Sequence, residues 1–132
     1  MKSKWKQFLR RRLRALRKQP ALAFKNMTPA KIPKRAGVYL IRAKGKPYYV
    51  GRSKNLCRRL YTNHLMGSLA NARLKKYLCT SGECADPEDA KRFLQKYASV
   101  QWIDEKDMRT RGALEGYFTA VLFPKYGIAE EH

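Results

Sequence analysis

GVYLIRAKGKPYYVGRSKNLCRRLYTNH, residues 37–64, is the stretch that decides the fold of this 132-residue chain. Two apolar runs, residues 38–43 and 48–51, flank a short turn that contains Lys44 and Gly45. Glycine readily adopts the positive φ that a tight hairpin turn requires. Because strands joined by a tight turn must be antiparallel, this stretch predicts a β-hairpin.

Apolar periodicity predicts the other elements of the fold. We expect helices over residues 53–65, 69–78, 87–97 and 107–123, and a third strand over residues 99–103. Ser53 and Asp107 are the expected N-caps, because such side chains accept hydrogen bonds from the first turn of a helix. Four apolar side chains of the last helix should pack inward, namely Leu114, Phe118, Val121 and Leu122. The predicted fold class is α+β, with a small three-stranded antiparallel sheet flanked by helices.

The N-terminal segment is basic and amphipathic. An apolar stripe at helical spacing runs through residues 3–18 and consists of Trp5, Phe8, Leu9, Leu13 and Leu16. Such a helix can lie on a membrane surface or dock its stripe on a domain. We expect docking, with Arg10, Arg11 and Arg14 turned toward phosphates. The expected organisation is a helix over residues 1–18, a proline-containing connector over 19–32, the main domain over 33–127 and a tail over 128–132.

The charge of the chain points to a polyanionic partner. The net charge is +20, from 30 Lys and Arg against 10 Asp and Glu. Residues 1–82 contain 23 of the basic residues and no acidic residue. Surfaces that only keep a protein in solution mix both signs, whereas an unbroken positive field attracts polyanions, most commonly nucleic acid. The composition therefore predicts a nucleic-acid partner.

Cysteine content and hydropathy indicate the cellular compartment of the protein. The three cysteines, Cys57, Cys79 and Cys84, are an odd number, which argues against a secreted disulfide framework. Their spacing suits a zinc site poorly. We see no apolar run long enough to span a bilayer or to form the core of a signal peptide. We expect a cytoplasmic protein with no membrane partner, associated with the nucleoid if it is bacterial.

Four sequence elements occur in the order and at the spacing of a known family. The tripeptides Gly37-Val38-Tyr39 and Tyr49-Val50-Gly51 place two tyrosines ten residues apart, and Arg59 follows ten residues later. Glu115 lies near the start of LEGYFTAVLFPKYG, residues 114–127. Over residues 33–127 the chain thus resembles the GIY-YIG nucleases.

This resemblance implies a metal-dependent endonuclease that hydrolyses phosphodiester bonds in DNA with Mg²⁺ or Mn²⁺. Tyr39 and Tyr49 would be the phenols of the site, with Tyr39 preferred as the base and surrounding cations favouring its phenolate. Arg59 would bind a phosphate oxygen through its planar fork. Glu115 would hold the metal, since one carboxylate with water and phosphate is a normal Mg²⁺ shell. The basic residues Arg52, Lys54 and Arg58 are expected phosphate contacts.

Two positions depart from the family pattern. Many members carry His or Tyr four residues after the arginine, where this chain has Asn63; His64 is one residue further. One residue rotates a helical side chain by about a quarter turn, so His64 either assists proton transfer in the site or packs on its own helix. Gly127 replaces the usual Asn, which is viewed as supporting the site, and lowers the expectation of full activity.

Other functions stay open from the sequence alone. One alternative is a non-catalytic DNA- or RNA-binding module that keeps the fold, and another is a basic RNA-binding or ribosome-associated protein. The sequence also leaves open whether the DNA is branched, damaged or site-specific, and whether the protein is a monomer or a homodimer.

Overall fold

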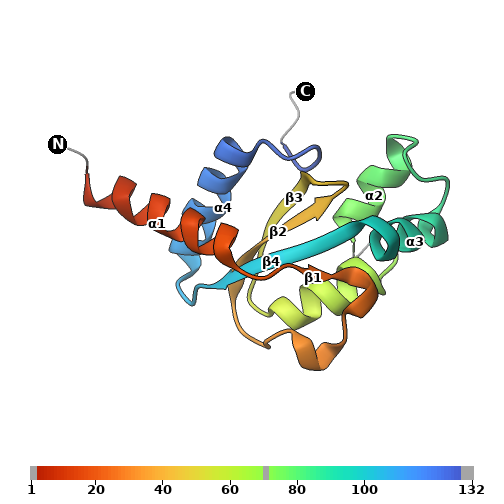
Figure 1. Ribbon diagram of the computed structural model, residues 1–132, viewed down its shortest axis with the longest axis horizontal. Helices are drawn as coiled ribbons and strands as arrows, with labels where there is room; N and C mark the ends of the chain where they lie inside the picture. The colour runs from red at the N-terminus through yellow and green to blue at the C-terminus, as the bar shows by residue number, and fades with distance from the viewer. Residues whose placement is uncertain (1–2, 70–71, 129–132) are drawn as a thin grey trace.

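The centre of the protein is a four-stranded antiparallel sheet with the strand order β1-β4-β2-β3. The computed structural model describes residues 3–69 and 72–128. The strands are β1 (Leu22–Ala23), β2 (Gly37–Ala43), β3 (Lys46–Ser53) and β4 (Ala98–Asp104). Helices cover both faces of the sheet, so the α+β class is confirmed (Figure 1).

The predicted number of three strands was wrong. The fourth strand, β1, lies within the expected connector and pairs Leu22 with Val100 and Ala23 with Ser99. A strand of two residues is too short to show the alternation by which strands are recognised in a sequence. Two short 3₁₀ helices, η1 (Phe24–Asn26) and η2 (Pro29–Lys31), follow it.

The helices are α1 (Lys4–Lys18), the π-helix η3 (Arg58–Leu65), α2 (Arg73–Thr80), α3 (Pro87–Tyr97) and α4 (Met108–Leu122). Asp107 caps α4 as predicted, because its carboxylate accepts a hydrogen bond from the peptide N–H of Thr110 at 2.9 Å. The helix predicted from residue 69 begins instead at Arg73, and residues 70 and 71 of that prediction lie outside the described residues.

The predicted cap of the helix after the hairpin was also wrong. Ser53 is the last residue of β3, and its hydroxyl accepts a hydrogen bond from the N–H of Asn55 at 2.9 Å. The Asn55 side chain performs the capping and accepts from the N–H of Arg58 at 3.0 Å. The chain therefore turns tightly between strand and helix, which keeps Arg59 close to the end of β3.

Two apolar cores lie on the two faces of the sheet. In Figure 1, α1 and α4 lie on one side of the sheet and α2 and α3 on the other. Leu9, Leu13 and Leu16 of α1 pack with Val38, Leu40, Val50, Ile103, Leu114 and Phe118. The opposite core contains Tyr39, Ile41 and Tyr49 of the hairpin together with buried side chains of η3, α2 and α3. Alternate residues of β2 thus supply both cores, as its central position requires.

The expected docking of the N-terminal helix is confirmed. Leu16 is fully buried, and the amide of Gln101 on β4 donates hydrogen bonds to the carbonyls of Arg17 and Gln19 at the end of α1. The stripe is not buried throughout, because Trp5 is 49% exposed and stacks on Phe8 with ring centroids 5.3 Å apart. None of the helices within the described residues has the length and apolar character needed to cross a bilayer.

The last helix packs less completely than expected. Leu114 and Phe118 are fully buried, but Val121 is 47% exposed. The helix ends at Phe123, which adopts a left-handed conformation at φ 46° and directs the chain away before Pro124.

A β-bulge in the hairpin sets the direction of two tyrosines. Ile41 pairs with Tyr49, but the next residue, Arg42, pairs with Pro47, so Tyr48 is an extra residue on β3. Successive residues of a regular strand point to opposite faces, and a bulge relaxes this rule. Tyr48 and Tyr49 consequently contribute to the same core, beneath α2 and α3.

Candidate active site

Three side chains predicted from the sequence meet in the core beneath the hairpin. The rings of Tyr39 and Tyr49 have centroids 6.3 Å apart, and the imidazole of His64 lies 5.5 Å from the first and 5.4 Å from the second. The hydroxyl of Tyr39 and Nε2 of His64 form a buried hydrogen bond of 2.7 Å. The structure therefore brings both phenols and the imidazole into one cluster.

Gly51 makes this cluster sterically possible. In the hairpin register Tyr39 stands opposite Gly51. The phenol of Tyr39 lies across this position, so a Cβ at residue 51 would overlap the hydroxyl oxygen and Cζ of Tyr39. The glycine of the second tripeptide is explained by this close approach of a ring to the backbone.

The π-helix explains why His64 reaches the site. Its defining hydrogen bonds join residues five apart, as in Met66 N–H to the carbonyl of Tyr61 at 3.0 Å. Five residues after Arg59 in a π-helix therefore correspond to about one turn, as four do in an α-helix. His64 thus takes the direction that the sequence pattern assigned to Asn63, and Asn63 lines the surface groove next to it. The buried Lys75 donates from Nζ to the carbonyls of Leu65 and Gly67 and holds the end of this helix.

Burial keeps Tyr39 and His64 uncharged. Desolvation, with a smaller contribution from Arg59 and Lys75, lowers the pKa of His64 to about 3. Desolvation raises the pKa of Tyr39 well above its ordinary value, and nearby Tyr49 raises it further. Arg59 opposes this shift without reversing it. Arg59 and Arg73 thus favour the Tyr39 phenolate as expected, but burial outweighs them and the pKa of Tyr39 stays raised.

Nδ1 of His64 is the second ring nitrogen of this cluster. It is buried and finds no hydrogen-bond partner within the described part of the chain. Two tautomers fit the 2.7 Å contact, since either the phenol donates to Nε2 or Nε2 donates to the phenol. In the first the imidazole can receive the phenol proton, and in the second it stabilises a phenolate.

Glu115 on α4 lies close enough to these phenols to influence them. Its charge raises the pKa of both Tyr39 and Tyr49, although by less than burial does. Among the described residues its one ion-pair partner is Arg52, with Nη1 and Oε1 a loose 3.9 Å apart. Burial raises the pKa of Glu115 and Arg52 opposes it. The carboxylate is thus half-buried, and among the described residues its one ion pair is long, so its oxygens are not held by a close partner.

Arg73 is a site residue that sequence reasoning missed. It begins α2, and Tyr77 one turn later has its ring 6.4 Å from that of Tyr49. After burial, Arg73 is the strongest influence on the pKa of Tyr49, which it lowers. Together with Arg52 and Arg59 it also lowers the pKa of Glu115 against the effect of burial. Nothing in the basic sequence around Arg73 distinguishes it from its neighbours.

A basic groove of about 400 Å³ opens beside this cluster. Its lining includes the four predicted phosphate contacts Arg52, Lys54, Arg58 and Arg59. Arg111 also lines it but is buried and donates to the carbonyls of Glu105 and Lys106, so it is held by the backbone rather than by Glu115. Arg10, Arg11 and Arg14 are exposed on α1 and are not among the described residues that line this groove.

Glu83 anchors the C-terminal segment over the site and was also missed. Its carboxylate accepts hydrogen bonds from Tyr48 at 2.6 Å, Tyr126 at 2.6 Å and Lys125 at 2.8 Å. Partial burial alone would raise the pKa of Glu83, but these three hydrogen bonds outweigh it and lower the pKa. Its position as the first acidic residue of the chain is the feature that could have marked it.

The C-terminal segment also explains why this chain has Gly127 where the sequence pattern usually has Asn. Hydrogen bonds from the N–H groups of Lys125 and Tyr126 to the carbonyls of Pro47 and Tyr48 lay the segment along β3. Gly127 has φ +89°, and a Cβ there would lie 2.8 Å from Cε1 of Tyr49. An asparagine would therefore need the Tyr49 ring to shift, whereas glycine lets the segment close on that ring.

Sequence comparison identifies the family. A model of the GIY-YIG catalytic domain matches residues 35–107, more than half of the chain. The chain belongs to the GIY-YIG family. This domain is a nuclease fold, and its matched region holds the hairpin, η3, α2, α3 and β4. No curated protein sequence matches the chain significantly.

Solved structures of a GIY-YIG domain resemble the chain at low identity. They include the N-terminal endonuclease domain of UvrC from Thermotoga maritima bound to magnesium, described as its catalytic divalent cation. It is 24% identical, covers 74% of this chain and 88% of its own, and has a TM-score of 0.48. A point mutant of the same domain, in which tyrosine is replaced by phenylalanine, is 23% identical with the same coverage and a TM-score of 0.49. The family assignment rests on the sequence match rather than on these structures.

The residues of this GIY-YIG domain fit a cation held by one carboxylate. No group of three or more His, Cys, Asp or Glu side chains suited to a metal occurs within residues 3–69 and 72–128. Glu115 offers a half-buried carboxylate near the phenols, and its one ion pair among the described residues is a loose 3.9 Å long. Mg²⁺ is commonly bound through one or two carboxylates, with water and substrate phosphate completing its octahedron.

Burial of a neutral His64 predicts a specific pH dependence of stability. Its pKa is about 3 in the folded protein, against an ordinary value of 6.5 for an exposed imidazole. Between these values the unfolded chain binds a proton that the folded protein does not, so the free energy of unfolding falls as pH is lowered, by up to about 1.4 kcal/mol per pH unit.

His64→Gln should remove this dependence. Urea unfolding at pH 7, 6, 5 and 4 measures it, with the wild type as the matched reference for all other titrating groups. We expect the wild type to lose its stability advantage over the variant as pH falls. A constant difference between the two would contradict a buried neutral imidazole.

Proposed function

We propose that this protein is a divalent-metal-dependent endonuclease that hydrolyses phosphodiester bonds in DNA. The observation that carries the proposal is the buried Tyr39–His64 hydrogen bond of 2.7 Å beside Tyr49, Glu115 and a basic groove. A phenol, an imidazole, a loosely paired carboxylate and several guanidinium groups are what phosphodiester hydrolysis needs. The first two can move a proton, and the others can bind metal and phosphate.

Glu115 is the proposed metal-binding residue for Mg²⁺ or Mn²⁺. A bound divalent cation would supply charge stabilisation at the phosphoryl oxygens and the leaving oxygen. The loose 3.9 Å contact with Arg52 supports the proposal, because the guanidinium can leave the carboxylate for a substrate phosphate.

Tyr39 is the proposed base, with His64 as the residue that controls its proton. The attacking water loses its proton to the Tyr39 oxygen, while the imidazole either takes the phenol proton at Nε2 or donates Nε2–H to the phenolate. Tyr49 is the more exposed phenol, at 8% against 1%, and is proposed to position water or phosphate. Both phenols are protonated at neutral pH because burial raises the pKa of each.

Three arginines are proposed to bind the phosphate that is cut. They are Arg52, Arg59 and Arg73. Arg52 and Arg59 line the basic groove, and each of the three arginines lowers the pKa of Glu115 through its charge. A planar guanidinium offers two parallel hydrogen bonds to phosphate oxygens and stays charged at any physiological pH. Lys54, Arg58 and the exposed arginines of α1 would contact flanking phosphates.

Cleavage should depend on Glu115 and on added metal. We expect nicking of supercoiled plasmid in Mg²⁺ or Mn²⁺ to stop with EDTA and to fall by about a hundredfold or more in Glu115→Gln, the scale of losing a principal electrostatic group. Glu88→Gln, on the exposed first turn of α3, is the control. Undiminished cutting by Glu115→Gln would overturn the proposed metal site, and binding without cutting by the wild type would favour the non-catalytic module.

Tyr39→Phe should slow cleavage by about a hundredfold or more, as loss of a general base commonly does. Tyr49→Phe should cost less. The wild-type rate should rise toward alkaline pH, because the working form is the phenolate and the pKa of Tyr39 is raised by burial. Single-turnover rates over pH 6 to 9.5 test this. If Tyr49→Phe is the slower of the two variants, Tyr49 is the base.

The exposed face of α1 should contribute to DNA affinity. Deleting α1 would remove Leu9, Leu13 and Leu16 from the core, so substitution is the appropriate test. The triple variant Arg10→Gln, Arg11→Gln, Arg14→Gln should bind duplex DNA more weakly and with a flatter salt dependence. Each lost phosphate contact removes about 0.9 from the slope of log K against log salt. An unchanged slope by fluorescence anisotropy would place the DNA away from α1.

A further inference from the structure

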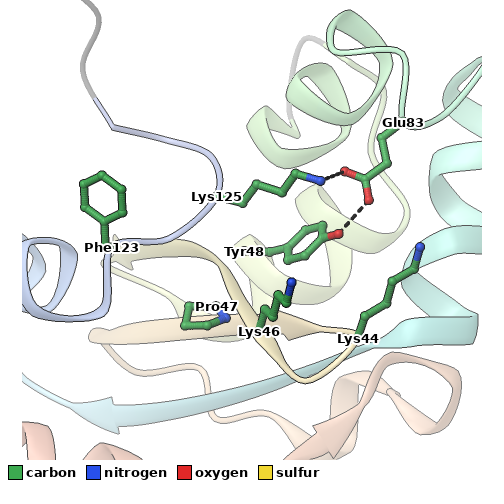
Figure 2. A pocket seen from close by; sticks show the side chains of 7 residues that line it. All are labelled: Lys44, Lys46, Pro47, Tyr48, Glu83, Phe123 and Lys125. Atoms are coloured by element: carbon green, nitrogen blue, oxygen red, sulfur yellow. Dashed lines mark hydrogen bonds and ion pairs between the residues drawn. The ribbon is translucent and has the colours of Figure 1, made fainter.

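A second hollow lies at the other end of β3 from the basic groove. It has a volume of about 540 Å³ and is lined by Lys44, Lys46, Pro47, Tyr48, Glu83, Phe123 and Lys125. Figure 2 shows Phe123 at one side and Lys44 at the other, with Lys46, Tyr48 and Lys125 between them and Glu83 above. The residues proposed for catalysis take no part in this lining.

We propose that this hollow binds an unpaired nucleotide of the DNA strand that the protein cuts. The inference rests on the proposed function and names its substrate class, which is DNA with unpaired bases near the cut. The evidence comes from the charge at the rim, the conformation of Phe123 and the position along β3.

The rim of the hollow is basic although a carboxylate forms its floor. Glu83 is occupied by hydrogen bonds from Tyr48, Tyr126 and Lys125, and Lys125 also neutralises its charge. Lys44 and Lys46 are exposed at the hairpin turn and have no carboxylate partner among the described residues. Lys44 places its ammonium over the rings of Phe93 and Tyr97, 5.4 and 4.8 Å from their centroids, and Lys46 presents its positive charge to a phosphate.

Phe123 exposes its aromatic ring to solvent, and its backbone has an unfavourable left-handed conformation. It is 75% exposed, with φ 46° and ψ 63° at the C-terminal cap of α4. Glycine is the usual residue in this conformation, and a bulky side chain there is strained by about 1 kcal/mol or more. An exposed ring beside lysines matches the way proteins bind single strands, where bases stack on aromatic rings and cations follow the backbone.

The hollow lies within reach of the same DNA strand as the candidate active site. Lys46 and Arg52 are six residues apart on β3, which at about 3.4 Å per residue is roughly 20 Å. This equals about six steps of a stacked strand. Lys125 and Tyr126 donate hydrogen bonds to the carbonyls of Pro47 and Tyr48 between the two ends, so a strand would pass over this C-terminal segment on its way from the groove to Phe123.

An unpaired base can stack on the Phe123 ring, but a base inside a duplex cannot. Away from the ends of a duplex both faces of a base are covered by its neighbours, and exposing a face requires breaking that stack. An overhang, a gap or a branch offers a base face without this cost. The geometry thus favours such substrates over blunt duplex.

Binding measured in EDTA tests the inference separately from cleavage. The probes are a 20-base-pair blunt duplex and the same duplex with a six-nucleotide overhang that carries 2-aminopurine. We expect the wild type to prefer the overhang probe and to quench its fluorescence. Phe123→Asn should weaken overhang binding by about 5- to 150-fold, the range for loss of one base–aromatic stack, and leave blunt binding unchanged.

Phe123→Asn suits this test because asparagine tolerates the left-handed conformation, so the fold should be retained. Val121→Ala, which removes another exposed apolar group of α4, is the matched control, and Phe123→Tyr should retain the preference. Equal binding of both probes by the wild type, equal weakening of both by Phe123→Asn, or no DNA binding would overturn the inference. Overhang preference without cleavage in Mg²⁺ would support the hollow and overturn the proposed catalysis, whereas cleavage without preference would do the reverse.

Discussion

The hydrogen bond between Tyr39 and His64 joins the centre of the sheet to the π-helix, and the rest of the site depends on it. Tyr39 stands on the strand that pairs with both of its neighbours, so its ring has little freedom. Its phenol needs a polar partner because the hydroxyl is buried, and the imidazole supplies one at 2.7 Å. Gly51 must lack a side chain to admit the ring, and the helix must widen to bring His64 to it.

The buried, uncharged cluster of Tyr39 and His64 lies beside the exposed, cationic groove. Burial raises the pKa of Tyr39 and lowers that of His64, so one physical cause keeps both uncharged. Arg52 stays largely exposed, where hydration stabilises its charge, and Arg59 is half-buried at the boundary. Glu115 lies at the same boundary, half-buried with one loose partner among the described residues. This gradient from core to groove is what makes the cluster a candidate for chemistry rather than packing alone.

Several elements were predictable because their causes are local. The hairpin follows from two apolar runs around Lys44 and Gly45, both of which have positive φ. The α4 cap follows from Asp107, and the docking of α1 follows from its apolar stripe. The resemblance also drew attention to Tyr39, Tyr49 and Glu115. Predictions failed where the cause was distant: β1 is held by β4, far along the chain, and Val121 is exposed because, within the described residues, the face of α4 that carries it is left uncovered.

By itself, the sequence determined the α+β class, the family spacing and the separation of charge along the chain, since each follows from residue order and composition. Only the tertiary structure decided how the side chains converge. The bulge at Tyr48 turns two adjacent tyrosines to one face, and the π-helix turns His64 rather than Asn63 inward. Arg73 and Glu83 join the site from segments remote from the hairpin, through packing of α2 and hydrogen bonds to the C-terminal segment. Local spacing cannot encode these contacts, because they arise only when distant segments pack and bury their polar groups together.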